Sequence, residues 1–255
     1  MLRPMRLPSV GGACLALAGL ACASTPEPDP RYRPPQSVLE VVAVLRAHIP
    51  DDTYRFEPAR DFTGRNVYRS SLLRLESLER VHAEALQAGH LDGVIAFAKG
   101  RSLERLRAFD LAAGEYRLAA ARDPELAEDA LAGARTCDAL HAAAAIGVDV
   151  GELSDATARI DEAELAHTVA EFDERNARLE EIAQEVSDSH YAPVVREEIE
   201  RTDVARGQYF AGLRRAIPNG DVRAPAELQR VASLHRDSKD EPRHLVAVAR
   251  IYEDL

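Results

Sequence analysis

The sequence is poor in the residues that build aromatic cores and disulfide frameworks. Its 255 residues include no Trp, aromatic residues make up 5% of the chain, and only 3 Cys are present. A mixture rich in Ala and Arg but poor in aromatics favours helices over sheets. With 46% hydrophobic and 29% charged residues, the composition is that of one globular domain or one array of small repeats.

Basic charge and long apolar runs are also scarce. The formal net charge is -11, which argues against a broad basic face for nucleic acid or an anionic lipid surface. The main apolar stretch, residues 7–21, is shorter than the roughly 20 residues that cross a bilayer. P-loop, GxGxxG, GxSxG, HExxH, paired Cys-x2-Cys and EF-hand sequences are absent. We therefore predict a protein that is not an enzyme and uses no cofactor.

Residues 1–21 have the layout of an export signal, because Arg3 and Arg6 precede a stretch of small apolar residues. The stretch ends in LAGLAC at residues 17–22 and resembles a bacterial lipoprotein signal, in which small residues lead into a Cys that receives a diacylglyceryl group. Gly19 departs from that pattern, which usually has a large aliphatic residue three places before the Cys. The resemblance implies that Cys22 is lipidated and anchors the chain to a membrane.

The residues around Cys22 also set the expected location. Ala23 and Ser24 place no Asp after the Cys, which in an enterobacterial-type sorting system favours the outer membrane, facing the periplasm. Ala21-Cys22-Ala23 is also an A-x-A cleavage site, so ordinary secretion is an alternative. An uncleaved cytoplasmic start is the third.

Residues 22–36 are expected to form a Pro-rich tether. Five Pro residues between Ser24 and Gln36 predict an extended, semi-rigid spacer that holds the folded body off the membrane. If Cys14 leaves with the signal and Cys22 is acylated, Cys137 is alone and makes no internal disulfide. We interpret Cys137 as a small buried hydrophobic residue.

Residues 37–255 are predicted to form an all-α domain, because apolar residues recur at helical spacing. Asp123-Pro124 is typical of a helix start. The predicted helices lie near residues 37–48, 66–88, 92–107, 109–122, 124–146, 160–188, 191–216, 225–236 and 242–255.

One pair of these helices carries a repeat signature. Gly100, Ala112, Tyr116 and Pro124 have the spacing of the tetratricopeptide pattern, so residues 93–126 resemble a tetratricopeptide unit. Residues 245–252 repeat its first-helix half. The resemblance implies an antiparallel helical-hairpin array, a tetratricopeptide-like α-solenoid, in which small Gly100 and Ala112 let the helices approach closely.

A second element stands apart from the repeat. Apolar residues at three- and four-residue spacing run from Leu165 to Val186, and a partner stripe runs from Val195 to Leu213 beyond a Pro-containing turn. Residues 160–216 are therefore predicted to form a long helical hairpin that projects from the repeat region or bridges it.

The first helices of tetratricopeptide units line a groove that takes peptides or helices. Carried onto this chain, that property implies a partner-binding face for an envelope protein or peptide. Its predicted members are Val94, Phe97, Arg101, Glu104 and Arg105, continued by Leu131, Arg135 and Asp138. The leading hypothesis is therefore an envelope lipoprotein that acts as an interaction scaffold or assembly factor.

Two alternatives remain at this point. An envelope enzyme such as a cell-wall hydrolase would show buried acids in a deep cleft. A metal-binding helical bundle would need its Glu-x-x-His motifs to converge. Those motifs are Glu79/His82, Glu164/His167 and Glu241/His244.

Overall fold

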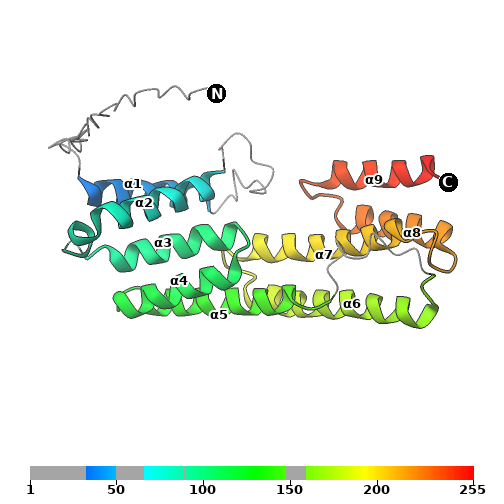
Figure 1. The fold of residues 1–255 in the computed structure, drawn as a ribbon, viewed down its shortest axis with the longest axis horizontal. Helices are drawn as coiled ribbons and strands as arrows, with labels where there is room; N and C mark the ends of the chain where they lie inside the picture. The colour runs from blue at the N-terminus through cyan, green and yellow to red at the C-terminus, as the bar shows by residue number, and fades with distance from the viewer. Residues whose placement is uncertain (1–32, 50–65, 89, 148–158) are drawn as a thin grey trace, which may run out of the picture. The chain divides into compact units, whose positions relative to one another are not determined.

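The computed structural model describes residues 33–49, 66–88, 90–147 and 159–255. Helices make up 80% of these residues, and no strand occurs among them (Figure 1). The predicted all-α fold class is therefore confirmed. The helices are α1 (Pro34–His48), α2 (Val67–Ala88), α3 (Asp92–Arg105), α4 (Phe109–Arg122), α5 (Ala127–Ala144), α6 (Glu162–Glu185), α7 (Ala192–Gly212), α8 (Gly220–Leu234) and α9 (Glu241–Glu253).

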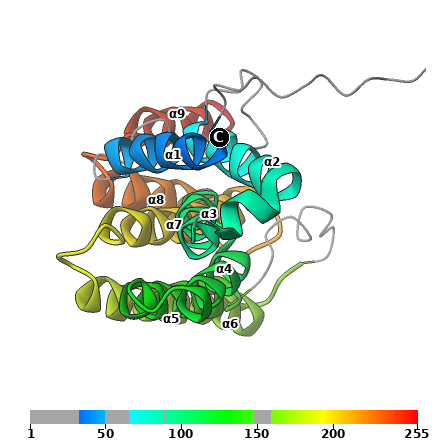
Figure 2. The same cartoon turned by 90° about the vertical axis from the view of Figure 1, so that its left-hand side faces the viewer.

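Helices that follow one another in the chain pack against one another. Contacts join each helix to the next from α1 to α9, and α1 also contacts α3. Figures 1 and 2 show the result within residues 34–255, with successive helices such as α3 and α4 lying side by side. Most packing is therefore between helices that are close in sequence.

Three clusters of buried side chains hold these helices together. The first joins α1, α2 and α3 through residues such as Val38, Leu75 and Ile95. The second joins α3, α4 and α5 to the C-terminal part of α6 and the N-terminal part of α7. The third joins the remaining parts of α6 and α7 to α8 and α9. The hairpin of α6 and α7 thus belongs to two of the three clusters and connects them.

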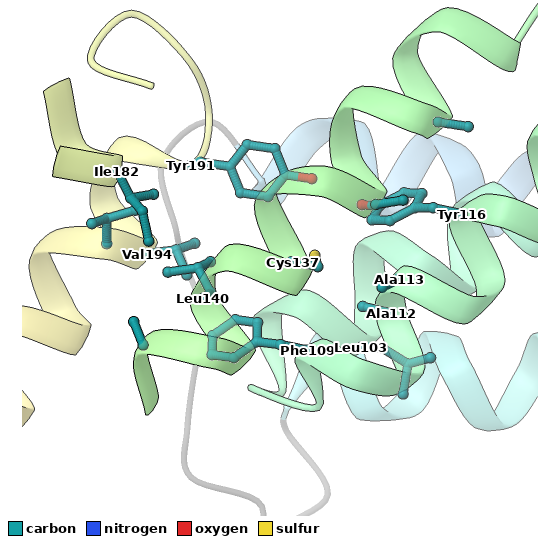
Figure 3. Close-up of a cluster of buried hydrophobic side chains, with 14 of the residues drawn as sticks. Leu103, Phe109, Ala112, Ala113, Tyr116, Cys137, Leu140, Ile182, Tyr191 and Val194 are labelled. Carbon is teal, nitrogen blue, oxygen red and sulfur yellow. The ribbon is translucent and has the colours of Figure 1, made fainter. Parts of the chain in front are cut away.

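Small residues permit the closest approach within the second cluster. A Cβ atom added at Gly100 would lie 2.8 Å from the ring of Tyr116, and one added at Gly133 would lie 3.1 Å from the other side of that ring. Tyr116 and Ala112 have no exposed surface. Figure 3 shows Tyr116 within this cluster, with Ala112 and Ala113 beside it on the same helix. The predicted role of Gly100 and Ala112 as helix-contact positions agrees with this packing.

Three helices begin three or more residues away from the predicted start. Pro34 and Pro35, expected in the tether, form the first turn of α1, where a missing N–H costs nothing. Helix α5 begins at Ala127 and not at Pro124, and Asp123 accepts a hydrogen bond from the Glu125 amide in the turn before it. Helix α8 begins at Gly220, so Pro225 lies inside it.

The predicted signal at 1–21, the lipidation site Cys22 and most of the tether lie outside the described residues. Within the described ranges, no helix has both the length and the apolar character needed to cross a membrane. Cys137 is fully buried in the second cluster. Burial, together with the nearby charge of Glu104, raises the pKa of its thiol, which agrees with its interpretation as a buried hydrophobic residue.

Candidate functional site: an arginine-lined cavity

Glu104 of α3 is the centre of a buried polar cluster, and its side chain has no exposed surface. Its Oε2 accepts a hydrogen bond of 2.5 Å from the Tyr116 hydroxyl. Its Oε1 lies 3.1 Å from Nε2 of His190 and 3.5 Å from Nη1 of Arg101. A carboxylate in a core is costly unless it is paired and hydrogen-bonded. The cluster therefore ties α3 to α4 and to the turn between α6 and α7.

His190, in the turn between α6 and α7, is held in its neutral form. Its Nδ1 lies 3.0 Å from Nη1 of Arg101, and because a guanidinium only donates, Nδ1 is the acceptor. The ring proton is therefore on Nε2, from which it is donated to Glu104. Burial, followed by the charges of Arg101 and Arg105, lowers the pKa of His190 to about 3. The ring stays uncharged near neutral pH.

Aromatic rings surround the guanidinium group of Arg101. Its central carbon lies 5.0 Å from the ring centroid of Phe97 and 5.9 Å from those of Tyr116 and Tyr191. Burial alone would lower the pKa of Arg101, but the charge of Glu104 and the interactions with Tyr116 and Tyr191 together outweigh burial, and the pKa is raised. Cation–π contacts and the ion pair hold the cation in one position. Its side chain remains 21% exposed.

The exposed part of Arg101 lines a cavity of about 460 Å³ between α3, α5 and the turn after α6. Arg135, an exposed residue of α5, lines the same cavity and has no ion-pair partner among the described residues. Tyr191 forms part of its wall beside Gly133. The carboxylates of Asp129 and Glu185 also line it. We call this site the arginine cavity.

The arginine cavity brings together part of the predicted partner-binding face. Arg101 and Arg135, which are distant in sequence, line it as the repeat frame implied. Phe97 lies against Tyr116, with the two ring centroids 5.4 Å apart, and it packs against the second hydrophobic cluster. Phe97 therefore positions Arg101 in addition to any contact it makes with a partner.

Two predicted members of that face are buried instead. Glu104 is 0% exposed and Arg105 is 1% exposed. Arg105 donates hydrogen bonds from Nη2 to the carbonyl oxygens of Ile49 and His190 at 3.2 and 2.9 Å. The expectation that Glu104 and Arg105 line an open groove is therefore corrected. Helical spacing placed them on the right side of α3, but the turn after α6 covers that side.

The other predicted members lie away from the arginine cavity. Val94 is partly buried against the first hydrophobic cluster. Leu131 is 44% exposed on α5. Asp138 is also exposed and forms an ion pair with Arg117 of α4. A role for Leu131 and Asp138 in partner binding stays a prediction.

A second cavity, of about 480 Å³, follows one face of α7. Residues of α7 at helical spacing line it: Glu197, Arg201, Val204 and Gln208. Residues of α6, α8 and α9, together with Arg107 and Ala144, form the rest of its walls. We call it the α7 groove. It lies on the predicted 160–216 hairpin, and most of the charged groups that line it are paired with one another.

Buried acids are concentrated beside the α7 groove. Glu198 is 5% exposed and accepts two hydrogen bonds from Arg107, at 2.5 and 2.7 Å. Glu200 is 9% exposed and accepts hydrogen bonds through Oε1 from the Ser238 hydroxyl at 2.5 Å and from Nε2 of His244 at 2.6 Å. These acids therefore join α7 to the turn before α4 and to α9.

Asp203, on the same helix, is held in its charged form. Burial would raise the pKa of Asp203, but the hydrogen bonds and the charges of His235 and Arg230 together outweigh burial, and the pKa is lowered. The two contacts are 2.8 and 2.9 Å long. A lowered pKa is the opposite of what a proton-donating catalytic acid requires.

The three Glu-x-x-His motifs lie on separate helices, α2, α6 and α9, and face different partners. Glu79 pairs with Lys99 at 3.2 Å. His167 is exposed, 3.7 Å from Glu171. His244 is committed to Glu200. Within the part of the chain that the structure describes, no three His, Cys, Asp or Glu side chains are grouped to hold a metal ion.

Sequence reasoning missed His190 and Tyr191, which complete the arginine cavity. They lie in the Pro-containing turn that follows α6, and 86 residues separate His190 from Glu104. No local pattern pairs residues over that distance. No protein-family model matches the chain, and no curated protein or solved structure matches it.

Proposed function

We propose that this chain is a lipid-anchored protein of the bacterial envelope that acts as an interaction scaffold and binds a segment of another envelope protein at the arginine cavity. Support for the anchor comes from the lipoprotein-like signal ending at Cys22 and the Pro-rich segment after it. The chain is not an enzyme in this proposal, and the helical body presents a binding surface.

The proposal includes a tetratricopeptide-like array for the helical body. Sequential packing of α1 to α9 supports it, as does the Gly100–Tyr116 contact at the positions where the repeat pattern has a small and an aromatic residue. Arrays of this kind present a continuous face to extended partners. The long hairpin of α6 and α7 closes one side of that face here.

A single observation carries the proposed function: Arg101 is fixed by three aromatic rings and a buried carboxylate, yet it reaches a cavity that Arg135 also lines. Holding a guanidinium in one geometry lowers the entropy lost when it binds. Arg and aromatic residues in well-packed pockets are typical binding hot spots. The cavity therefore has the features of a preorganised contact site.

Site-specific crosslinking in cells tests this function. A photo-crosslinking amino acid at Ala132, an exposed residue that lines the cavity, should capture a discrete envelope protein. The same amino acid at Ala121, exposed on α4, is the control and should not capture it. Equal capture at both positions, or none at Ala132, would contradict a partner at the arginine cavity.

An envelope enzyme is the second candidate function, because the α7 groove contains a Glu200–His244 pair whose atoms are 2.6 Å apart. Such a pair can act in general acid–base catalysis. Degradation of purified cell wall by the protein, lost in both the Glu200→Gln and His244→Gln variants, would favour the enzyme. If the parent protein does not degrade the cell wall, the enzyme hypothesis is contradicted and the scaffold remains the proposed function.

A further inference from the structure

Helix α9 has an apolar face that no other helix among the described residues covers. Leu245, Val246 and Tyr252 of this face are 54%, 48% and 52% exposed, and Ala249 is also exposed. We call these four residues the α9 face. The opposite side of α9 packs through Ile251 into the third hydrophobic cluster, and Figure 1 shows α9 beside α8, at the edge of the helical body. A contiguous exposed apolar patch is typical of a contact between chains.

Helix α3 shows what covers a face with this spacing. The positions of α3 with the same four- and three-residue spacing as Leu245, Ala249 and Tyr252 are Ala96, Gly100 and Leu103. All three are buried, with Ala96 at 1% and Leu103 at 8% exposure, because α4 packs against them. A second helix that lies along α9, as α4 lies along α3, would therefore bury the α9 face.

Contacts within the chain hold the α9 face in position. The Tyr252 hydroxyl accepts a hydrogen bond of 2.9 Å from Nε2 of Gln229 on α8. On the buried side of α9, Nε2 of His244 lies 2.6 Å from Oε1 of Glu200 on α7. An aromatic ring that is already fixed loses little entropy when another chain packs against it.

The charges at the edge of the α9 face are complementary to a second copy of the same helix. Arg243 and Glu253 are exposed near opposite ends of α9, on the same side of the face. Their midpoint is residue 248, and the midpoint of Leu245 and Tyr252 lies between residues 248 and 249. An antiparallel second α9 centred there would place Arg243 opposite Glu253 and Leu245 opposite Tyr252 of the other copy. Small Ala249 would lie at the crossing and permit close approach.

We propose that the protein forms a two-fold dimer in which α9 of one copy packs antiparallel against α9 of a second copy through the α9 face. Such a contact uses the same surface on both copies, so it closes at two chains. A helix of 13 residues provides less than the roughly 20 residues a side of a standard interface, so we expect a dissociation constant in the micromolar range. The arginine cavity does not include α9, so this proposal is independent of the proposed function.

Sedimentation equilibrium of the purified protein tests the dimer, in a density-matched detergent so that bound detergent adds nothing to the measured mass. Between about 1 and 200 μM the mass should rise from one chain toward two. Leu245→Glu should weaken association at least about tenfold, because it buries a charge in the contact. Leu73→Glu, at an exposed Leu of α2, is the matched control and should leave association unchanged.

Charge reversal tests the antiparallel orientation. Arg243→Glu and Glu253→Arg should each weaken association about threefold, because each places like charges opposite one another. The double variant restores opposite charges and should restore association. All of these are surface positions, so circular dichroism can confirm that each variant keeps its helical fold.

Three results would overturn the proposal. The first is a mass of one chain at every concentration. The second is a mass that grows beyond two chains, or a loss in Leu39→Glu, at an exposed position of α1, as large as that in Leu245→Glu, since either indicates head-to-tail association. The third is equal association of the Leu245→Glu and Leu73→Glu variants, or a double charge variant that associates no better than the single ones.

Discussion

Helices α3 and α4 approach each other through small residues, whereas α7 adds buried charged pairs to its apolar contacts with its neighbours. A Cβ atom at Gly100 would lie 2.8 Å from Tyr116, so that crossing depends on shape. On α7, Glu198, Glu200 and Asp203 are all buried and all paired. Close packing is specified by the residues at the crossing alone. Buried pairs need a partner from another helix, so they fix which helices meet.

Glu104 of α3 is a buried charge within the otherwise close-packed contact of α3 with α4. Its substitution is expected to have the largest effect on stability. Glu104→Gln should lower the free energy of unfolding by about 3–5 kcal/mol, because it leaves Arg101 without its carboxylate. Denaturant unfolding measures the change. Glu180→Gln, at an exposed position of α6, is the matched control and should have little effect. Similar midpoints for the two variants would show that the cluster adds no stability.

Overpacking at Gly100 is expected to have the next largest effect. Gly100→Leu should lower the free energy of unfolding by about 1–3 kcal/mol, because the side chain must displace Tyr116. At Gly114, on the exposed side of α4, an added Cβ meets nothing within 4 Å. Gly114→Ala should therefore stabilise by up to about 1 kcal/mol through helix propensity. An unchanged thermal midpoint in Gly100→Leu would remove the physical basis of the repeat frame.

Acidic pH should lower the free energy of unfolding through His190, which contacts Glu104 of α3. The pKa of His190 is lowered to about 3 in the folded protein and is about 6.5 in an unfolded chain. Between these values the unfolded chain binds a proton that the folded chain does not. Stability is therefore complete above about pH 6.5 and falls as the pH drops toward 3, by up to about 1.4 kcal/mol per pH unit.

The His190→Gln variant separates this effect from the titration of other groups. It should show a shallower loss of stability between about pH 6.5 and 3 when unfolding is measured at several pH values, because Gln does not titrate. Parallel curves for the variant and the parent would show that another group causes the acid sensitivity.

The smallest effect is expected where α7 and α8 cross. A Cβ atom at Gly207 would lie 3.2 Å from a terminal methyl carbon of Leu228, which can move by a few tenths of an ångström. Gly207→Ala should change the free energy of unfolding by less than about 1 kcal/mol, since the packing cost and the gain in helix propensity oppose each other. A loss of unfolding free energy as large as that of Gly100→Leu would mean that the α7–α8 crossing depends on close packing as much as the α3–α4 crossing does.

Part of the arginine cavity could be anticipated from the sequence. The repeat resemblance placed Arg101 and Arg135 on one predicted face, and both line the cavity. It could not show that the turn after α6 covers the end of α3. Glu104 and Arg105 were therefore expected at an open face, although they are 0% and 1% exposed.

The sequence by itself determined the positions of the helices, because the periodicity of apolar residues and the local stops are properties of neighbouring residues. It also determined the close contact at Gly100, since the small and aromatic positions belong to one helical hairpin. Only the tertiary structure decided which charges are buried together. His190 and Glu104 are 86 residues apart, and Glu200 and His244 are 44 apart, and a pairing over such a distance depends on how whole hairpins pack.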